Sequence, residues 1–252
     1  MSGAAPVRAR VGAQASFEVR SLLRNGEQIL VSIVLPLLVL AGLVVVAPDA
    51  LLLGHPGAAP VDVAVPGVLA LAVVSTAFTG QAISVAYERR YGVLRLLGTT
   101  PLGRSGLLMA KGTAVLVVVA VQCLVLGVAG LLLGWRPGPG AIALAVPMVL
   151  LGSAVFIALS AVVGGRLRAE AVLALANLLW VLFLGCGLVL PAETLPGSLA
   201  TVALLSPPGA LGEGMRAATL GHPAVVAQSA GVMLAWAVVL GLLATRTLRW
   251  SD

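Results

Sequence analysis

The chain has 252 residues, of which 60% are apolar and only 10% are charged. An ordinary soluble domain is about 45–50% apolar and about 25% charged, which excludes a water-soluble enzyme here. The hydrophobicity also excludes intrinsic disorder, and two cysteines are too few for a disulfide scaffold. The composition predicts an all-α polytopic membrane protein, built as a single transmembrane domain over residues 1–252.

Six apolar stretches are long enough to cross a bilayer, which takes about 20 apolar residues. None of them contains Asp, Glu, Lys, Arg or His, and they cover residues 29–47, 66–86, 112–134, 141–163, 171–190 and 224–245. Pro66 is expected to open the second span, because proline suits the first turn of a helix. Pro36 and Pro147 fall inside predicted spans and are expected to kink those helices.

The basic residues predict how the chain is oriented in the membrane. With six spans, both termini lie on the same side, together with the second and fourth loops. That side carries thirteen basic residues and the other side two, Arg136 and Arg216. The thirteen are Arg8, Arg10, Arg20, Arg24, Arg89, Arg90, Arg95, Arg104, Lys111, Arg166, Arg168, Arg246 and Arg249. The positive-inside rule therefore predicts cytoplasmic termini, and the net charge of +6 requires no nucleic-acid partner.

The residues before the first span predict an amphipathic helix over residues 10–28 that lies in the cytoplasmic membrane interface. Its apolar positions recur near helical spacing: Val11, Ala15, Val19, Leu22, Leu23 and Leu30. Its polar positions form an opposing stripe: Arg10, Gln14, Glu18, Ser21, Asn25 and Gln28. The alternative is a basic N-terminal segment that only sets the topology.

The second loop, residues 87–104, combines many charges with three leucines that are too apolar to be left in water. Exposed apolar side chains ringed by charge mark a docking surface for a partner. The alternative is that Leu94, Leu96 and Leu97 pack against the N-terminal helix while the arginines set topology. The residues by themselves favour neither interpretation.

This loop resembles the cytoplasmic coupling segment of ABC-2 type transporter permeases. The family pattern is roughly Glu-Arg-x-x-Gly-x-Leu-x-x-Leu-x-x-Thr-Pro, followed by a basic residue. The matching positions are Glu88, Arg89, Gly92, Leu94, Leu97, Thr100, Pro101 and Arg104. Arg95 stands where an acidic residue is often found. The resemblance extends to the layout, which is that of a type V exporter: an amphipathic N-terminal helix, six spans, and an external excursion before the last span.

The resemblance implies a complex of two permease subunits and two nucleotide-binding subunits, with the substrate moving between the permeases. The chain lacks the Gly-x-x-x-x-Gly-Lys-Ser/Thr loop, so ATP and Mg²⁺ are expected on a separate P-loop ATPase, with no cofactor on this chain. That ATPase is expected to dock on the coupling segment. The second permease is either an identical or a different chain.

The external segment, residues 191–223, contains the run Ser206, Pro207 and Pro208. Family members similarly place a Ser-Pro run and short, partly re-entrant helices near the outer mouth of the pathway. The stretches 199–205 and 210–220 are too short to cross the membrane and too apolar for a free loop. They are expected to lie at, or dip into, the outer interface, with an ordinary surface loop as the alternative.

Four polar side chains fall inside the predicted spans: Gln81, Gln122, Asn177 and Gln228. Such groups line a pathway or bond neighbouring helices together, and we favour bonding, at about 1 kcal/mol or less each. His55 and His222 stand alone in external loops, so no metal site and no catalytic residue is expected.

These features predict the permease subunit of an ATP-driven exporter in a bacterial inner membrane. A charge-free interior suits an amphipathic cargo, such as a drug, a lipid or a polymer precursor. The alternatives are a haem-export permease of cytochrome biogenesis, and a channel or structural subunit outside the ABC class. Six spans without an ionisable residue argue against a proton-coupled transporter. With one lysine against 14 arginines, the composition indicates a high-GC bacterium.

Overall fold

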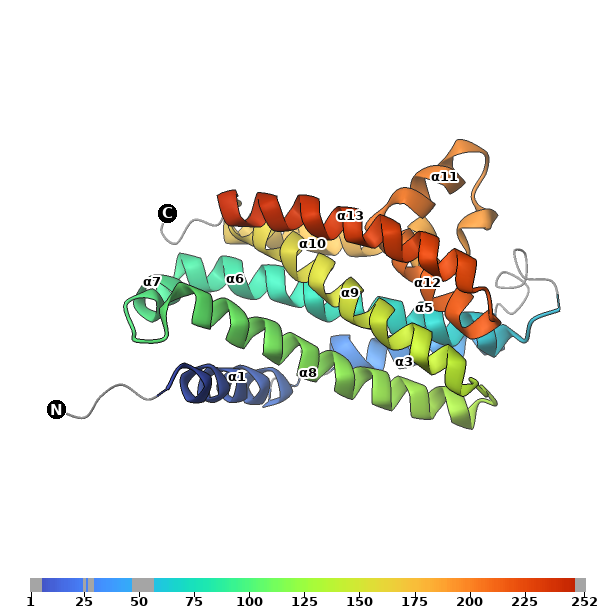
Figure 1. The fold of residues 1–252 in the computed structure, drawn as a ribbon, viewed down its shortest axis with the longest axis horizontal. Coiled ribbons are helices and arrows are strands. Elements are labelled where there is room, and N and C mark those ends of the chain that lie inside the picture. Colours follow the sequence, from blue (N-terminus) through green and yellow to red (C-terminus); the bar gives the residue numbers. More distant parts are fainter. Residues whose placement is uncertain (1–5, 25, 27–29, 47–56, 248–252) are drawn as a thin grey trace.

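The computed structural model describes residues 6–24, 26, 30–46 and 57–247, and it is helical with no strand among them. Both ends of the predicted 29–47 span lie outside these residues, as do residues 25, 27 and 28 of the predicted 10–28 helix, His55 and Arg249. In the bundle, long helices run along one common direction, and α7 lies at one end of it (Figure 1).

In the part of the chain that the structure describes, five helices are long and apolar enough to cross a membrane: Pro60–Arg90, Ser105–Leu132, Pro139–Gly164, Ala169–Leu188 and Pro223–Arg246. Within the described residues the first predicted span is a shorter apolar helix, Ser32–Val45. It combines the π-helical turn η1 (Leu30–Val34) with α3 (Leu35–Val45). Pro36 lies inside this helix as expected, and because proline has no backbone N–H it cannot donate a hydrogen bond to the preceding turn.

The second span is the centre of the fold. It comprises α5 (Pro60–Val74), the π-helical turn η2 (Ser75–Gly80) and α6 (Gln81–Arg90), and it is buried along almost its whole apolar length. The expectation that Pro66 opens this helix was wrong. Pro60 occupies the first turn and Asp62 follows it near the helix N-terminus, where a carboxylate is favourable. Pro66 lies inside α5 and is buried.

The other helices surround this long helix, Pro60–Arg90, which we call the central rod. α8 (Gly103–Leu132) and α9 (Pro139–Gly164) follow each other in sequence, and α9 continues through Pro147. α13 (Pro223–Thr247) packs on α9. Three phenylalanines, one each from the central rod, α9 and the fifth span, pack together in the core. The ring centroid of Phe78 lies 6.5 Å from that of Phe156 and 5.8 Å from that of Phe183.

The fifth span stops short of its predicted end at residue 190. α10 (Ala169–Phe183) passes into the π-helical turn η3 (Leu184–Leu188), where Cys186 and Gly187 leave helical geometry and Gly187 adopts a φ of +81°. A short 3-10 turn η4 (Ala192–Thr194), α11 (Ser198–Leu205) and α12 (Pro207–Leu220) follow.

These last helices occupy the end of the bundle opposite α7, and α11 projects from its side (Figure 1). Eleven of the 14 residues of α12 are buried, and α12 packs among α5, α9 and α13. The alternative of an ordinary surface loop is therefore wrong for this helix, which belongs to the core of the domain.

Candidate functional site: the α1–α6–α8 end of the bundle

The end of the bundle that carries α7 contains a buried ion cluster. α1 (Val7–Arg24) packs along α8, with Ala15 buried between them. Lys111 of α8 is only 4% exposed, and its Nζ lies 3.0 Å from Oε1 of Glu18 and 2.6 Å from Oε1 of Glu88. One ammonium therefore joins three helices that are far apart in the sequence.

This cluster changes the interpretation of three residues. Glu88 was assigned to the segment that meets the ATPase, but its carboxylate faces the bundle interior and also accepts from Ser84 Oγ at 2.8 Å. Glu18 was placed on a polar stripe facing away from the apolar one, whereas it contacts α8 and accepts from Gln14 Nε2 at 2.9 Å. Lys111 was counted only as a topology signal.

The two arginines that follow Glu88 tie the end of α6 to the turn between α9 and α10. Arg89 is buried, and its Nη2 donates to the carbonyl of Leu167. Arg90 forms an ion pair with Glu170 in the first turn of α10. The C-terminal end of the central rod is thus bonded both to the α9–α10 turn and to α10.

α7 (Val93–Gly98) follows α6 after a sharp turn at Gly92, whose φ of +73° is in the left-handed region. Gly92 therefore ends α6 rather than lying in the middle of one helix, and a side chain there would be strained by about 1–2 kcal/mol. Thr100 Oγ1 donates to the carbonyl of Leu97 at 2.6 Å and closes the other end of α7. Pro101 is exposed just beyond, and the side chain of Arg104 lies outside what the structure describes.

The sequence left open whether the leucines of α7 are exposed for docking or packed inward, and in the structure they differ from one another. Leu94 is 3% exposed and packs with Val85 of α6 and Leu107 of α8, while Leu97 is partly buried against the same cluster. Leu96 points the other way and is 68% exposed. Leu94 and Leu97 therefore hold α7 on the bundle, on α6 and α8 rather than on the N-terminal helix.

Three exposed apolar side chains remain on the outer side of this turn: Tyr91, Val93 and Leu96. The guanidinium of Arg90 lies 5.9 Å from the centroid of the Tyr91 ring. Arg95, which lies between Val93 and Leu96 in the sequence, is also exposed. We call Tyr91, Val93 and Leu96 the α7 surface. Apolar side chains ringed by charge at a bundle end are typical of a protein contact.

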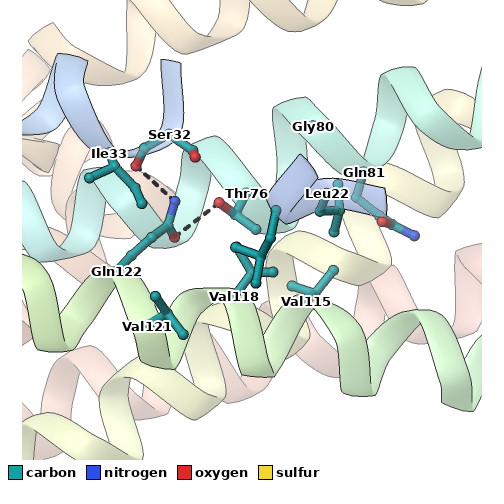
Figure 2. Close-up of a pocket in the computed structure, with 11 residues that line it drawn as sticks. Leu22, Ser32, Ile33, Thr76, Gly80, Gln81, Val115, Val118, Val121 and Gln122 are labelled. Atoms are coloured by element: carbon teal, nitrogen blue, oxygen red, sulfur yellow. Dashed lines mark hydrogen bonds between the residues drawn. The ribbon is translucent and has the colours of Figure 1, made fainter. Parts of the chain in front are cut away.

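Within the bundle, Gln122 joins three helices (Figure 2). Its side chain is fully buried; Nε2 donates to the carbonyl of Ser32 at 2.8 Å, and Oε1 accepts from Thr76 Oγ1 at 3.0 Å. Both polar ends of the amide are thus used in holding α8 to η1 and η2. Asn177 differs, because it is exposed on α10 and makes no hydrogen bond within the described part of the chain.

We expect Gln122→Leu to lower the free energy of unfolding by about 1–2 kcal/mol, because two interhelical hydrogen bonds in a membrane domain are lost. Asn177→Leu is the matched control and should leave stability and assembly unchanged. Unfolding of the purified protein in mixed micelles with increasing sodium dodecyl sulfate measures both. Equal effects of the two substitutions would contradict the assignment of Gln122 as an interhelical bonding residue.

The Ser206, Pro207 and Pro208 run begins α12. Ser206 caps the helix, since its Oγ accepts from the backbone N–H of Gly209 at 3.3 Å, and the two prolines occupy the first turn. These are the residue types that helix N-termini prefer. Their geometry accounts for why a helix starts here.

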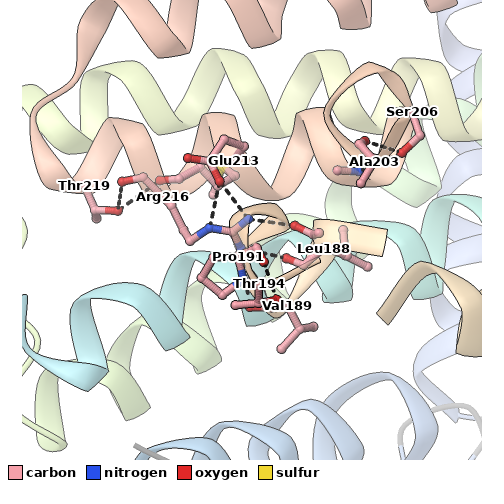
Figure 3. Close-up of polar contacts among 12 residues, drawn as sticks. Leu188, Val189, Pro191, Thr194, Ala203, Ser206, Glu213, Arg216 and Thr219 are labelled. Carbon is pink, nitrogen blue, oxygen red and sulfur yellow. Dashed lines mark hydrogen bonds and ion pairs between the residues drawn. The ribbon is translucent and has the colours of Figure 1, made fainter. Parts of the chain in front are cut away.

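α12 carries a second buried ion cluster, which the sequence reading missed (Figure 3). Arg216 is fully buried, and its Nη2 lies 3.0 Å from Oε2 of Glu213 one turn earlier. The guanidinium also donates to the carbonyls of Gly187, Leu188 and Val189 at 2.7, 3.2 and 3.4 Å. It therefore satisfies the backbone groups that the break in the fifth span leaves without helical partners. The available signal was a Glu-x-x-Arg spacing inside an apolar segment.

α12 approaches this break closely because it is rich in glycine. A Cβ added at Gly212 would lie 2.3 Å from the carbonyl oxygen of Gly187, which no side chain tolerates. Arg216 can bond this backbone because α12 and η3 touch. α12 and the broken end of the fifth span therefore form one unit.

The described residues contain no group of three or more potential metal ligands. They hold two buried ion clusters, Glu18–Lys111–Glu88 near α7 and Glu213–Arg216 near the break in the fifth span, and they expose the α7 surface.

Comparison with known proteins identifies the family of the chain. The profile of the family described as ABC-2 family transporter protein matches residues 59–246. A search of curated proteins found no match to the chain. The matched region runs from the start of the central rod almost to the end of α13. The protein is a multi-pass membrane protein that belongs to the ABC-2 transporter family.

Proposed function

We propose that this chain is the permease subunit of an ABC exporter and is driven by a separate P-loop ATPase that docks on the α7 surface. The observation that supports this most directly is the exposure of Tyr91, Val93 and Leu96 at the end of a buried central helix. ATP and Mg²⁺ bind to the ATPase in this proposal, and the permease contributes no cofactor site.

The central rod suits the transmission of a push from the ATPase. The helix Pro60–Arg90 is 31 residues long and contacts α3, α8, α9, α10 and α12. Glu88, Arg89 and Arg90 fasten its end to α8, to the α9–α10 turn and to α10. A displacement of α7 would therefore move several helices together instead of bending one loop.

The described ends of the chain support an arrangement in which both termini face the ATPase. The start of α1, the α9–α10 turn and the end of α13 all lie at the α7 end of the bundle (Figure 1). These segments and the α6–α8 turn carry most of the basic residues, so the positive-inside rule places this end in the cytoplasm. We place the protein in the cytoplasmic membrane of a bacterium on this basis.

The proposal includes a second permease, with the substrate moving outward between the two. α10 exposes an apolar face that includes Leu178 and Val181, and Asn177 lies among them. The cargo is an amphipathic compound, because the faces available to it are apolar with few polar groups.

The proposal predicts that Leu96→Asp weakens binding of the ATPase at least tenfold and abolishes substrate-stimulated ATP hydrolysis. A fully buried leucine contributes about 1.5–3 kcal/mol, and 1.4 kcal/mol corresponds to a factor of ten. The ATPase is identified as the P-loop protein that co-purifies with the wild-type chain, and the measurements are its co-purification with the variant and its activity in proteoliposomes.

Leu199→Asp is the matched control, because Leu199 is also an exposed leucine but lies on α11 at the opposite end of the bundle. It should leave ATPase binding unchanged. Wild-type binding and coupling in the Leu96→Asp variant, together with normal membrane insertion, would overturn the docking assignment.

A further inference from the structure

A deep apolar groove lies between α8 and α9. The two helices meet at the turn of residues 133–138 and separate along the bundle (Figure 1). The cavity between them has a volume of about 690 Å³, and its floor is formed by Leu69 of α5 together with Met215 and Thr219 of α12. Its volume is typical of a site for a small-molecule ligand.

The walls of the groove are suited to a hydrocarbon chain. On α8 they extend from Leu116 to Leu131, about 22 Å at 1.5 Å per residue, and on α9 from Ala141 to Leu150. Half of a bilayer core is about 15 Å thick, so this length accommodates the acyl chain of one lipid. At Gly127 a Cβ would have no neighbour within 4 Å, and this opening widens the groove in its middle.

Two side chains with hydrogen-bond donors, Trp135 and Arg136, lie at the narrow end of the groove, next to the α8–α9 turn. Trp135 lines the cavity and is 8% exposed, and its indole Nε1–H is buried without a hydrogen-bond partner. A buried donor without an acceptor is unfavourable, so an oxygen from a bound molecule at this end of the groove would stabilise the indole N–H.

Arg136 stands beside that donor. Its Nη1 donates to the carbonyls of Leu131 and Trp135 at 2.7 and 3.0 Å, which fixes the guanidinium at the narrow end of the groove. Within the described residues Nε and Nη2 make no further bond to the protein, although a guanidinium has five donors. The narrow end of the groove therefore presents a positive charge and free N–H groups.

We propose that this groove binds a membrane lipid with an anionic headgroup. One acyl chain lies between α8 and α9, the phosphate group contacts Arg136, and an oxygen of the headgroup or ester region accepts from Trp135 Nε1. The combination of an apolar channel with a cation and an unpaired donor at one end matches the chemistry of such a lipid. The site lies at the opposite end from α7, so it is independent of the proposed ATPase contact.

Brominated lipids test the proposal, because bromine in an acyl chain quenches tryptophan fluorescence on contact. The full chain is reconstituted in phosphatidylcholine vesicles that contain increasing fractions of brominated phosphatidylglycerol or brominated phosphatidylcholine. The emission of Trp135 is obtained as the difference between the wild type and Trp135→Phe. Phosphatidylglycerol should quench it at about a fivefold lower fraction, the preference expected of one charge at a membrane surface.

Two variants separate the headgroup contact from the groove. Arg136→Gln should make the two brominated lipids equally effective, and Gly127→Phe should reduce quenching by both, because the ring fills the groove. Gly231→Phe is the control, since Gly231 on α13 also has no neighbour within 4 Å of an added Cβ and lies outside the groove. It should behave as the wild type.

Equal quenching of the wild-type protein by the two lipids would overturn the proposal. So would a preference for phosphatidylglycerol that survives in Arg136→Gln. If neither lipid quenches Trp135 in the wild type, but both do in Gly127→Phe, the groove is occupied by a second protein chain and the lipid assignment is wrong.

Discussion

Arg216→Met should lower the free energy of unfolding by about 3–5 kcal/mol, the usual cost of removing one partner from a buried ion pair. The substitution leaves the buried carboxylate of Glu213 without its cation. It also leaves the carbonyls of Gly187, Leu188 and Val189 without the donor that replaces their helical partners. Methionine retains most of the side-chain length, so the loss is mainly electrostatic.

The measurement is unfolding of the purified protein in mixed micelles with increasing sodium dodecyl sulfate. The double variant Arg216→Met, Glu213→Leu should recover part of the loss, because no charge then remains buried. Arg136→Met is the control for replacing an arginine at the same end of the bundle, and it should have a small effect because Arg136 is exposed. An unfolding midpoint of Arg216→Met equal to that of the wild type would contradict the structural role assigned to this cluster.

Lys111→Met should release α1 from the bundle. The ammonium separates two carboxylates that both lie within 3.0 Å of it, and without the ammonium Glu18 and Glu88 repel each other in a partly buried place. The loss is about 3 kcal/mol, and it falls on the contact between α1 and α8. We also expect coupling between ATP hydrolysis and transport to fail, since Glu88 is no longer held against α8.

A cysteine at position 15 reports on this release, because Ala15 is buried between α1 and α8. In a background with Cys123 and Cys186 replaced by serine, Ala15→Cys should resist a membrane-permeant thiol reagent. Adding Lys111→Met should raise its labelling rate at least tenfold, and Glu18→Gln should restore part of the protection. Arg20→Met, on the exposed side of α1, should change nothing. Continued protection in the Lys111→Met variant would show that the apolar contact alone holds α1.

The sequence by itself determined the class of the protein and most of its spans. Uninterrupted apolar runs place the helices that start at Pro139, Ala169 and Pro223 within two residues of the predicted starts. Such runs can be recognised in the sequence alone, because each membrane-spanning helix satisfies its own backbone hydrogen bonds, whatever its neighbours are. The coupling-segment pattern likewise identified the family before any contact was known.

The tertiary structure decided where the charged side chains go. Glu18, Glu88 and Lys111 are separated by many residues, and nothing local in the sequence indicates that α1 and α6 meet at the same point of α8. Leu94 and Leu96 are two residues apart in one short helix, yet one anchors it and the other is exposed. The direction of a side chain depends on which face of its helix is covered, and the packing of other helices sets that.

The same reason explains the external segment. Its apolar composition indicated short helices that lie at, or dip into, the outer interface. The burial of α12 in the bundle goes with the break of the fifth span at Gly187, which leaves carbonyls for Arg216 to bind. A break of this kind requires a partner that supplies donors at the right depth. The composition of a segment states how much apolar surface must be covered, and only the assembled bundle decides which helix covers it.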